Sequence, residues 1–159
     1  MIRKSKSNIF GFWRQTKGVA AVEFAVVGTL FLLLVAGILD FGHAWYMKQV
    51  ITNGSREGAR YGITYRTNTS GVRIAPSAFN PTIENFVLNT YGLTSLLSSD
   101  AAPTVTCPAT TPNGYTTGTK GYPIQVRVTA VKHWFLLSAF IPGLGSTKTL
   151  VASTVMLCE

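Results

Sequence analysis

The side chains that could carry catalytic or metal chemistry are few and far apart in this sequence. The two histidines, His43 and His133, have no cysteine or carboxylate at the spacing of a metal site. After residue 60 the acids are only Glu84, Asp100 and Glu159, which are too scattered to nominate a general acid and base. The sequence also has no glycine-rich phosphate-binding loop. We therefore expect a protein that is not an enzyme and that uses no cofactor, metal ion or small-molecule substrate.

One ionisable residue lies where a charge is costly. Glu23 is the only charged residue of an apolar run over residues 19–39. A carboxylate inside a membrane span is unfavourable, and by default it marks a functional site. Glu23 is only four residues inside the run, so its side chain could equally reach the nearer headgroups. These residues alone leave both interpretations open.

The apolar run has the length of a membrane-spanning helix. Its 21 residues would extend about 32 Å as a helix, close to the roughly 30 Å hydrocarbon core of a bilayer. A buried core helix is the alternative, but such helices are rarely apolar on every side. A cleaved secretory signal has a shorter apolar region of about 7–15 residues, and Val35-Ala36-Gly37 is a poor cleavage site. We predict a transmembrane helix over residues 19–39.

The charge of the chain sets the orientation of this helix. The 159 residues carry a net charge of +8, with 47% hydrophobic and 13% charged residues, a composition that argues against disorder. Residues 1–18 hold five Lys or Arg and no acid. Such an arm could bind nucleic acid, but before a span it has a topological role. We therefore expect no nucleic-acid partner, a cytoplasmic N-terminus, and residues 40–159 on the other side of the membrane.

The start of the span resembles the processing site of type IV pilins and pseudopilins. The string runs from Lys17-Gly18-Val19 through small or apolar residues to Glu23-Phe24. The resemblance implies cleavage by a prepilin peptidase between Gly18 and Val19, which leaves Glu23 at the fifth mature position. Glu23 and Phe24 would then serve subunit assembly, because Glu23 can neutralise the new amino group of a neighbouring subunit. Val19 departs from the commonest pattern, which has Phe at the first mature position.

A longer match covers roughly residues 14–62. Ala21-Val22-Glu23-Phe24, then Asp40-Phe41-Gly42, then the run from Arg56 to Tyr61 together resemble the TadE-like family. That family consists of pseudopilin-like components of Flp/Tad pilus assembly. The resemblance implies a structural, minor-pilin-like role in pilus biogenesis and surface adherence, at the bacterial inner membrane. It also implies partners: prepilin peptidase, other pilins or pseudopilins, and the Tad secretion machinery. The alternative is an unprocessed, membrane-anchored binding or adhesive protein.

The helical pattern continues beyond the span and brings three glycines onto one side. Gly54, Gly58 and Gly62 recur every four residues, so on a helix they form a ridge without side chains. Such a ridge allows a partner helix to pack closely. Because each glycine also weakens a helix by about 1 kcal/mol relative to alanine, a frayed helix end is the alternative. We predict a helix-packing site.

The C-terminal part changes to the two-residue period of strands. Residues 123–131 and 147–157 alternate apolar and polar side chains, and residues 104–107 could add a short third strand. Residues 82–91 have helical spacing. The apolar stretch 134–144 either packs on the long helix or contacts a membrane or partner. Residues 108–121 have the composition of a loop.

The two cysteines, Cys107 and Cys158, follow the predicted span, and we expect them to form a disulfide bond in an oxidising compartment.

The predicted fold class is α+β: a long N-terminal transmembrane helix packed on a small antiparallel sheet, as in pilins. The chain divides into a basic cytoplasmic leader (1–18), the transmembrane helix (19–39), a periplasmic extension of that helix (40–62) and an exported α+β domain (63–159).

Overall fold

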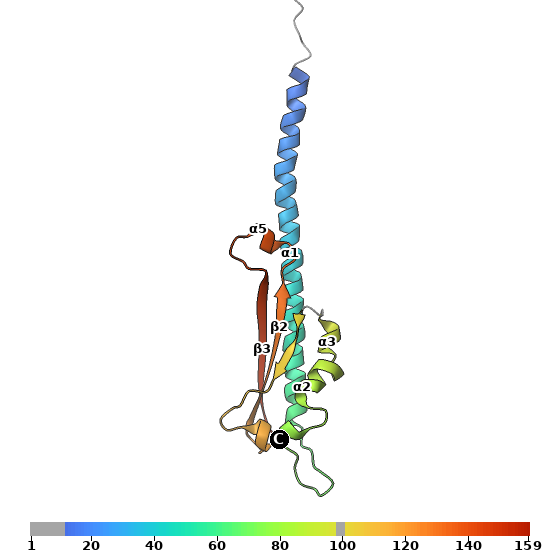
Figure 1. Cartoon of the computed structure of the whole chain (residues 1–159), viewed down its shortest axis with the longest axis vertical. Coiled ribbons are helices and arrows are strands. Elements are labelled where there is room, and N and C mark those ends of the chain that lie inside the picture. Colours follow the sequence, from blue (N-terminus) through green and yellow to red (C-terminus); the bar gives the residue numbers. More distant parts are fainter. Residues whose placement is uncertain (1–11, 98–100) are drawn as a thin grey trace, which may run out of the picture.

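A computed structural model of the chain describes residues 12–97 and 101–159, and describes side chains from residue 18 onward. One long helix, α1 (Phe12–Ile63), runs the length of the molecule, and the remaining elements gather around its C-terminal half (Figure 1). The predicted leader therefore lies largely outside the described residues. The predicted span and its predicted extension are one continuous helix.

The length of α1 follows from its sequence. Its 52 residues extend about 78 Å at 1.5 Å per residue, and they include no proline, the residue that most strongly breaks a helix. The hydroxyl of Thr29, the most polar group in the middle of the apolar run, donates to Ala25 O at 2.7 Å. This polar group is therefore satisfied within the helix.

The sheet has three antiparallel strands in the order β1-β2-β3. They are β1 (Thr104–Thr106), β2 (Pro123–His133) and β3 (Thr147–Leu157). The alternation predicted from the sequence is confirmed, since Ile124, Val126 and Val128 are fully buried on the face toward α1. Strand β2 continues two residues beyond the predicted end, and residue 107 lies outside β1.

Short helical segments complete the domain. The predicted helix over residues 82–91 is split into α2 (Ile83–Asn85) and the π-helical turn η3 (Phe86–Thr90), followed by α3 (Leu93–Leu96). The other segments are η2 (Pro76–Ala78), α4 (Gly114–Thr117) and α5 (Leu137–Phe140). Helix α4 lies in the stretch that was predicted as a loop.

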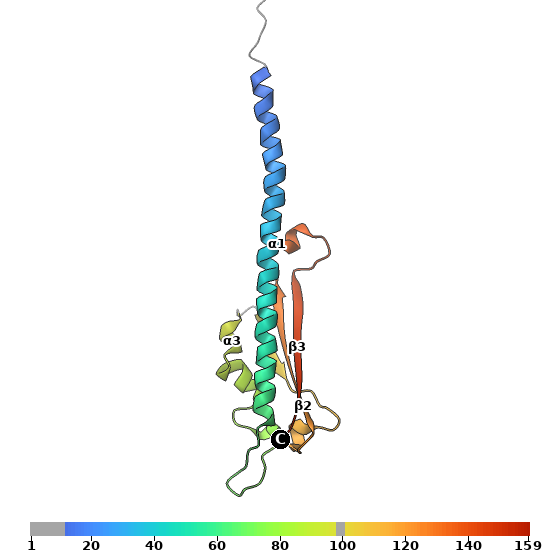
Figure 2. The ribbon, with the colours of Figure 1, turned by 180° about the vertical axis from the view of Figure 1, so that it is seen from behind.

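The core lies on both sides of the lower half of α1. In two opposite views, α1 stands between the sheet and the α2–α3 segment (Figures 1 and 2). Ile51 on α1, Ile83 on α2 and Val126 on β2 all have no exposed surface. Burying each such side chain stabilises the fold by about 1.5–3 kcal/mol. The predicted fold class, a long apolar helix packed on a small antiparallel sheet, is confirmed.

Candidate membrane and assembly site

The first described part of α1 is bare. From residue 18 to residue 32 every side chain is exposed except at Gly28, which is half-buried. Large apolar side chains point outward on all sides of the helix, among them Val22 (65% exposed) and Leu30 (66%). Only 6% of the most apolar 18-residue stretch of α1 is buried, and α1 is long and apolar enough to cross a membrane. A core helix of a soluble protein would be mostly covered.

The residues predicted for processing and assembly lie within this bare part. Gly18, Val19 and Glu23 are exposed, and Phe24 is 78% exposed. Val19 and Glu23 are four residues apart, so they lie on the same side of the helix, one turn from each other. The fold leaves all four residues accessible to lipid, to an enzyme or to another subunit.

The glycine ridge is covered by the chain itself. Gly54, Gly58 and Gly62 are all buried. A Cβ atom at Gly58 would lie 2.6 Å from Val87 Cγ2, and one at Gly62 would lie 2.7 Å from Ile83 Cδ1. Both distances are too short for real side chains, so the absence of a Cβ is required here. The ridge packs on the α2–η3 segment of the same chain, and another subunit does not reach it.

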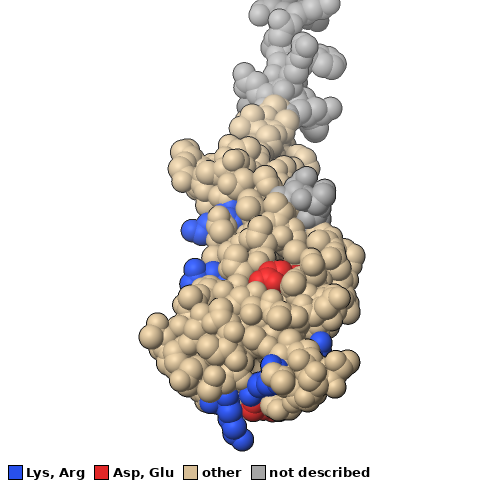
Figure 3. Space-filling model, turned by 60° about the horizontal axis from the view of Figure 1, so that its bottom comes forward, with Lys and Arg blue, Asp and Glu red and all other residues tan. Residues whose placement is uncertain are grey.

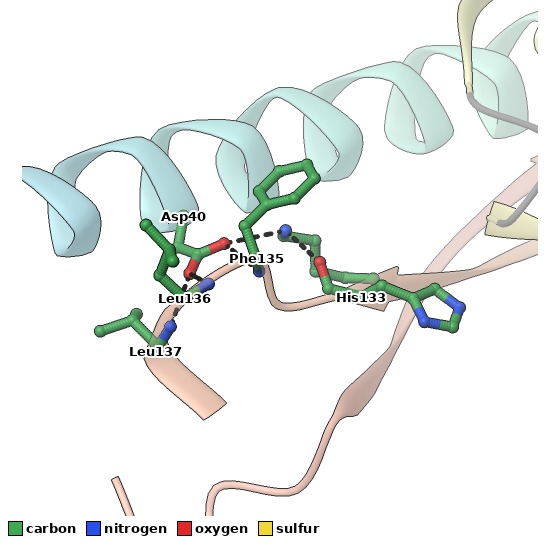
Figure 4. Close-up of polar contacts among 6 residues, drawn as sticks. Asp40, His133, Phe135, Leu136 and Leu137 are labelled. Carbon is green, nitrogen blue, oxygen red and sulfur yellow. Dashed lines mark hydrogen bonds and ion pairs between the residues drawn. The ribbon is translucent and has the colours of Figure 1, made fainter. Parts of the chain in front are cut away.

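A buried ion pair marks the place where the bare part of α1 ends. Asp40 is fully buried, and one of its carboxylate oxygens accepts from Lys132 Nζ at 3.3 Å. The same oxygen accepts from the backbone N–H of Phe135 at 2.8 Å, and the other accepts from the N–H groups of Leu136 and Leu137, each at 3.0 Å (Figure 4). Lys132 also donates to the carbonyl of His133. The carboxylate thus holds the start of α5 against α1.

The electrostatics explain why this pair can be buried. Burial alone raises the pKa of Asp40, but the three backbone N–H groups and then Lys132 outweigh it and lower the pKa to about 2. Asp40 is therefore ionised at any ordinary pH. A buried carboxylate that accepts four hydrogen bonds is compensated, and losing one partner would leave an uncompensated charge.

Aromatic rings surround the pair. The Lys132 ammonium lies 4.2 Å from the centroid of the Phe135 ring and 5.4 Å from that of Trp134, which are favourable cation–π distances. The Trp134 ring packs edge-on against Phe41 of α1, with centroids 5.9 Å apart. The ring of His43 lies 5.2 Å from that of Phe135, and burial lowers the pKa of His43, so its ring is neutral near pH 7.

The segment between β2 and β3, residues 134–146, is called the hairpin tip below. Its helix α5 packs against α1 through buried Leu137 and the Asp40 contacts. The other large apolar side chains of the tip are open: Phe135, Leu136, Phe140 and Ile141 are 66%, 47%, 53% and 44% exposed. Leu136 and Phe140 line an apolar groove together with residues 29–39 of α1. The stretch packs on α1, as one of the two predicted alternatives has it, and it also presents apolar surface; contact with a membrane or partner stays a prediction.

The cysteines are both free thiols in the structure. Cys107 follows β1 and Cys158 follows β3, and these strands flank β2 on opposite sides. The structure does not show the predicted disulfide, which stays a prediction. Burial raises the pKa of both thiols, and the nearby Glu84 carboxylate raises that of Cys107 further.

Charged groups are sparse on the rest of the domain. Figure 3 shows the end opposite the bare helix as mostly uncharged surface, with Lys and Arg side chains along its lower rim and one side. Within the described residues no group of three or more His, Cys, Asp or Glu could hold a metal ion. Two buried side-chain nitrogens there, His43 Nδ1 and Trp134 Nε1, lack a hydrogen-bond partner.

The Asp40–Lys132 pair is the feature that sequence reasoning missed. In the sequence, Asp40 belongs to a string that resembles the TadE-like family and to the charges that flank the span, and Lys132 belongs to no motif. The available signals were an acid directly after the span and a lysine at the strand end that precedes the apolar stretch. Either side chain, alone, has the ordinary interpretation of a solvated charge.

Comparison with known proteins finds a match for one part of the chain. No curated protein and no solved structure matches it. One family model matches a segment that lies wholly within α1. This segment includes the bare part, Asp40 and most of the glycine ridge. The family model described as TadE-like protein matches residues 18–60, so this segment of α1 is similar to that family.

Proposed function

We propose that the protein is a pseudopilin-like, minor-pilin component of the Tad pilus assembly system, with a structural role in pilus biogenesis and surface adherence. The observation that carries the proposal is the division of α1. Residues 18–32 of this helix form a bare apolar rod, and the part from Asp40 onward is the spine of a small domain. A rod of this kind can leave the lipid and pack against the rods of other subunits.

Glu23 supplies the polar contact for such packing. Cleavage after Gly18 would create a cationic amino group on Val19, on the same side of the helix as Glu23 and one turn from it. In the low-dielectric interior of a bundle, an amino group and a carboxylate from adjacent subunits attract strongly, and an unpaired one is costly. Pairing of Glu23 with a neighbouring subunit would therefore set the axial register of the helices.

The topology follows from the distribution of charge. Five basic residues and no acid precede the span, while residues 40–60 sum to +1. By the positive-inside rule the N-terminus is cytoplasmic and the domain lies in the periplasm of a bacterial inner membrane. The cleavage site then faces the cytoplasm, where a prepilin peptidase would act, and the other expected partners are pilins and the Tad secretion machinery.

The experiment that tests the proposal is N-terminal sequencing of the mature membrane form, together with assembly assays of two variants. The expected mature chain begins at Val19. Glu23→Ala should be processed normally but should not co-purify with other pilus subunits. The matched control is Glu57→Ala, which removes another exposed acid of α1 and should assemble as wild type. A mature chain that begins at Met1, or a Glu23→Ala variant that assembles normally, would contradict the proposal and favour an unprocessed, anchored adhesive protein.

A further inference from the structure

We propose that the hairpin tip is inserted in the bilayer beside α1, with lipid acyl chains as its partner, so that the domain is anchored at two points. The inference rests on α1 crossing the membrane. It does not depend on processing at Gly18 or on the role of Glu23.

The first step is the depth of the tip along α1. Leu136 and Phe140 share an apolar groove with residues 29–39 of α1. Leu33 of α1 is half-buried and Ala36 is buried, unlike their neighbours Leu32 and Leu34. From Asp40 back to Leu33 the helix rises about 10 Å. The tip thus extends beyond Asp40 along residues that belong to the apolar span (Figures 1 and 2).

The second step is the length of helix that remains if the tip stays in water. The apolar run is bounded at its start by Lys17, so the bare apolar part would be residues 19–32. These residues extend about 21 Å, roughly 9 Å less than the hydrocarbon core of an ordinary bilayer. The bilayer must therefore continue toward Asp40, and at that depth it surrounds the tip.

The third step is composition. No Asp, Glu, Lys or Arg occurs from residue 134 to residue 147. Four large side chains of this stretch are between 44% and 66% exposed: Phe135, Leu136, Phe140 and Ile141. They adjoin the exposed apolar surface of α1, so the two form one apolar surface. Such a continuous apolar surface is unfavourable in water and favourable in lipid.

The fourth step concerns polar groups, which must be satisfied in a membrane. The Asp40 carboxylate accepts the N–H groups of the three residues at the start of α5. Other N–H groups of the tip also have acceptors: Trp134 donates to Ser146 O at 3.1 Å and Ile141 to Leu137 O at 3.0 Å. The carboxylate itself is neutralised by Lys132. The Asp40 carboxylate and these backbone N–H groups are thus satisfied in a region of low dielectric, whereas the nearby Trp134 Nε1 has no partner.

Basic groups lie where phospholipid headgroups would be. Lys148 is exposed and stands opposite Lys132 in the β2–β3 register, directly below the uncharged stretch. A lysine at this level can extend its ammonium to lipid phosphates while its carbon chain stays in the apolar zone. Insertion would therefore fix the height of the domain above the membrane and its rotation about the α1 axis.

A depth measurement on the full-length chain in vesicles of phosphatidylcholine and phosphatidylglycerol tests this proposal. A polarity-sensitive fluorophore is attached to Phe140→Cys, with Ile141→Cys as a second position. Two controls of similar exposure are Val27→Cys on the bare helix (65% exposed) and Val155→Cys on β3 (57% exposed). The native thiols are buried or half-buried, and unsubstituted protein gives their background labelling. Quenching is measured with acyl-chain nitroxide lipids and, separately, with iodide in water.

The expected result is that probes at residues 140 and 141 behave like the probe at residue 27, quenched by nitroxide lipids and shielded from iodide, whereas the probe at residue 155 shows the reverse. Probes at 140 and 141 that are quenched by iodide alone would overturn the proposal. Probes quenched by neither reagent would also overturn it and would show that another protein surface covers the tip. A probe at residue 27 that is not quenched by lipid would remove the membrane anchor itself.

Discussion

The two halves of α1 share one continuous backbone and differ in what surrounds them. Between residues 18 and 32 the helix presents large side chains such as Phe31 and Leu32 on all sides, each more than 60% exposed. Further along, residues such as Gly54 and Ala59 are buried and small, and α1 lies between the sheet and the α2–α3 segment (Figure 2). The second half is therefore completed by its own chain, whereas the first half needs lipid or other subunits.

Large and small side chains divide between the two halves for a physical reason. In the covered half, packing on both sides of α1 requires the backbone to come close to Val87 and Ile83, which glycine allows. In the bare part, Gly18 and Gly28 have nothing within 4 Å of a Cβ position. Glycine spacing is thus informative only together with the partner that it faces. The Asp40–Lys132 pair lies at the transition between the two halves.

The largest loss of stability is expected from removing the Asp40 carboxylate. Asp40→Ala leaves Lys132 buried without its counter-ion and leaves three backbone N–H groups at the start of α5 without an acceptor. Removing one partner of a buried ion pair costs about 3–5 kcal/mol. We expect the free energy of unfolding of the detergent-solubilised domain to fall by about this amount in urea titrations that follow tryptophan fluorescence.

The matched control for Asp40 is an exposed ion pair of α1. Glu57 lies 3.4 Å from Arg60, and both side chains are exposed. Exposed pairs of this kind contribute about 0–1 kcal/mol, so Glu57→Ala should leave the unfolding transition almost unchanged. Equal losses in the two variants would mean that the Asp40 contacts do not hold the domain to the helix.

Lowering the pH is expected to reduce the free energy of unfolding by a smaller amount. Asp40 has a pKa of about 2 in the folded protein against an ordinary value of 3.8. Because the folded value is the lower one, the stabilisation is fully present above about pH 4 and is lost as the pH falls through 2. The shift corresponds to about 2 kcal/mol. Between about pH 5 and pH 2 the wild type should lose this amount more unfolding free energy than Asp40→Asn does.

The acid titration has an internal check. Glu57→Gln should keep the wild-type fall, because Glu57 is exposed and lies outside the buried pair. The acids other than Asp40 and Glu57 are present in all three proteins, so their contributions cancel in the difference. The titration of His43 changes in Asp40→Asn, because the Asp40 charge raises the pKa of His43. A wild type and an Asp40→Asn variant with parallel pH profiles would show that Asp40 titrates normally.

The fold could be predicted where the pattern is local. The two-residue alternation of β2 and β3 and the all-round apolarity of the bare helix both come from neighbouring residues, and both are confirmed. The Asp40–Lys132 contact joins residues 92 positions apart. The sequence around each residue does not indicate which residue it contacts, so only the folded structure shows the pair.

Two other features show the same limit. The spacing of Gly54, Gly58 and Gly62 predicted close packing but could not say that the partner is the α2–η3 segment of the same chain. The cysteine count predicted a disulfide, but it could not say where the turns after β1 and β3 place Cys107 and Cys158, which are free thiols in the structure. The cysteine count and the glycine spacing each describe the sequence alone. The partner of the glycines and the positions of the cysteines depend on which segments the fold brings together.

The difference between the two halves also predicts opposite responses to alanine. Gly58→Ala places a Cβ atom 2.6 Å from Val87 Cγ2. Overpacking costs about 1–3 kcal/mol, and the higher helix propensity of alanine returns about 1 kcal/mol. We expect a net loss of about 1 kcal/mol in urea titration. Gly28→Ala meets no atom and should leave the domain as stable as wild type. Equal effects would show that the covered half is less tightly packed than the structure indicates.

The smallest expected change concerns the thiols of the covered half. Cys158 is 3% exposed, and burial raises the pKa of both cysteines, so few thiolates form near neutral pH. In the folded, non-reduced protein, maleimide labelling of Cys107 and Cys158 should be slow, and it should become complete for two thiols after denaturation. The label on Val155→Cys, an exposed position of β3, provides the fast reference. An intact mass lower by two hydrogens, with no labelling after denaturation, would contradict this prediction. It would mean that the two thiols form the disulfide bond expected from the sequence.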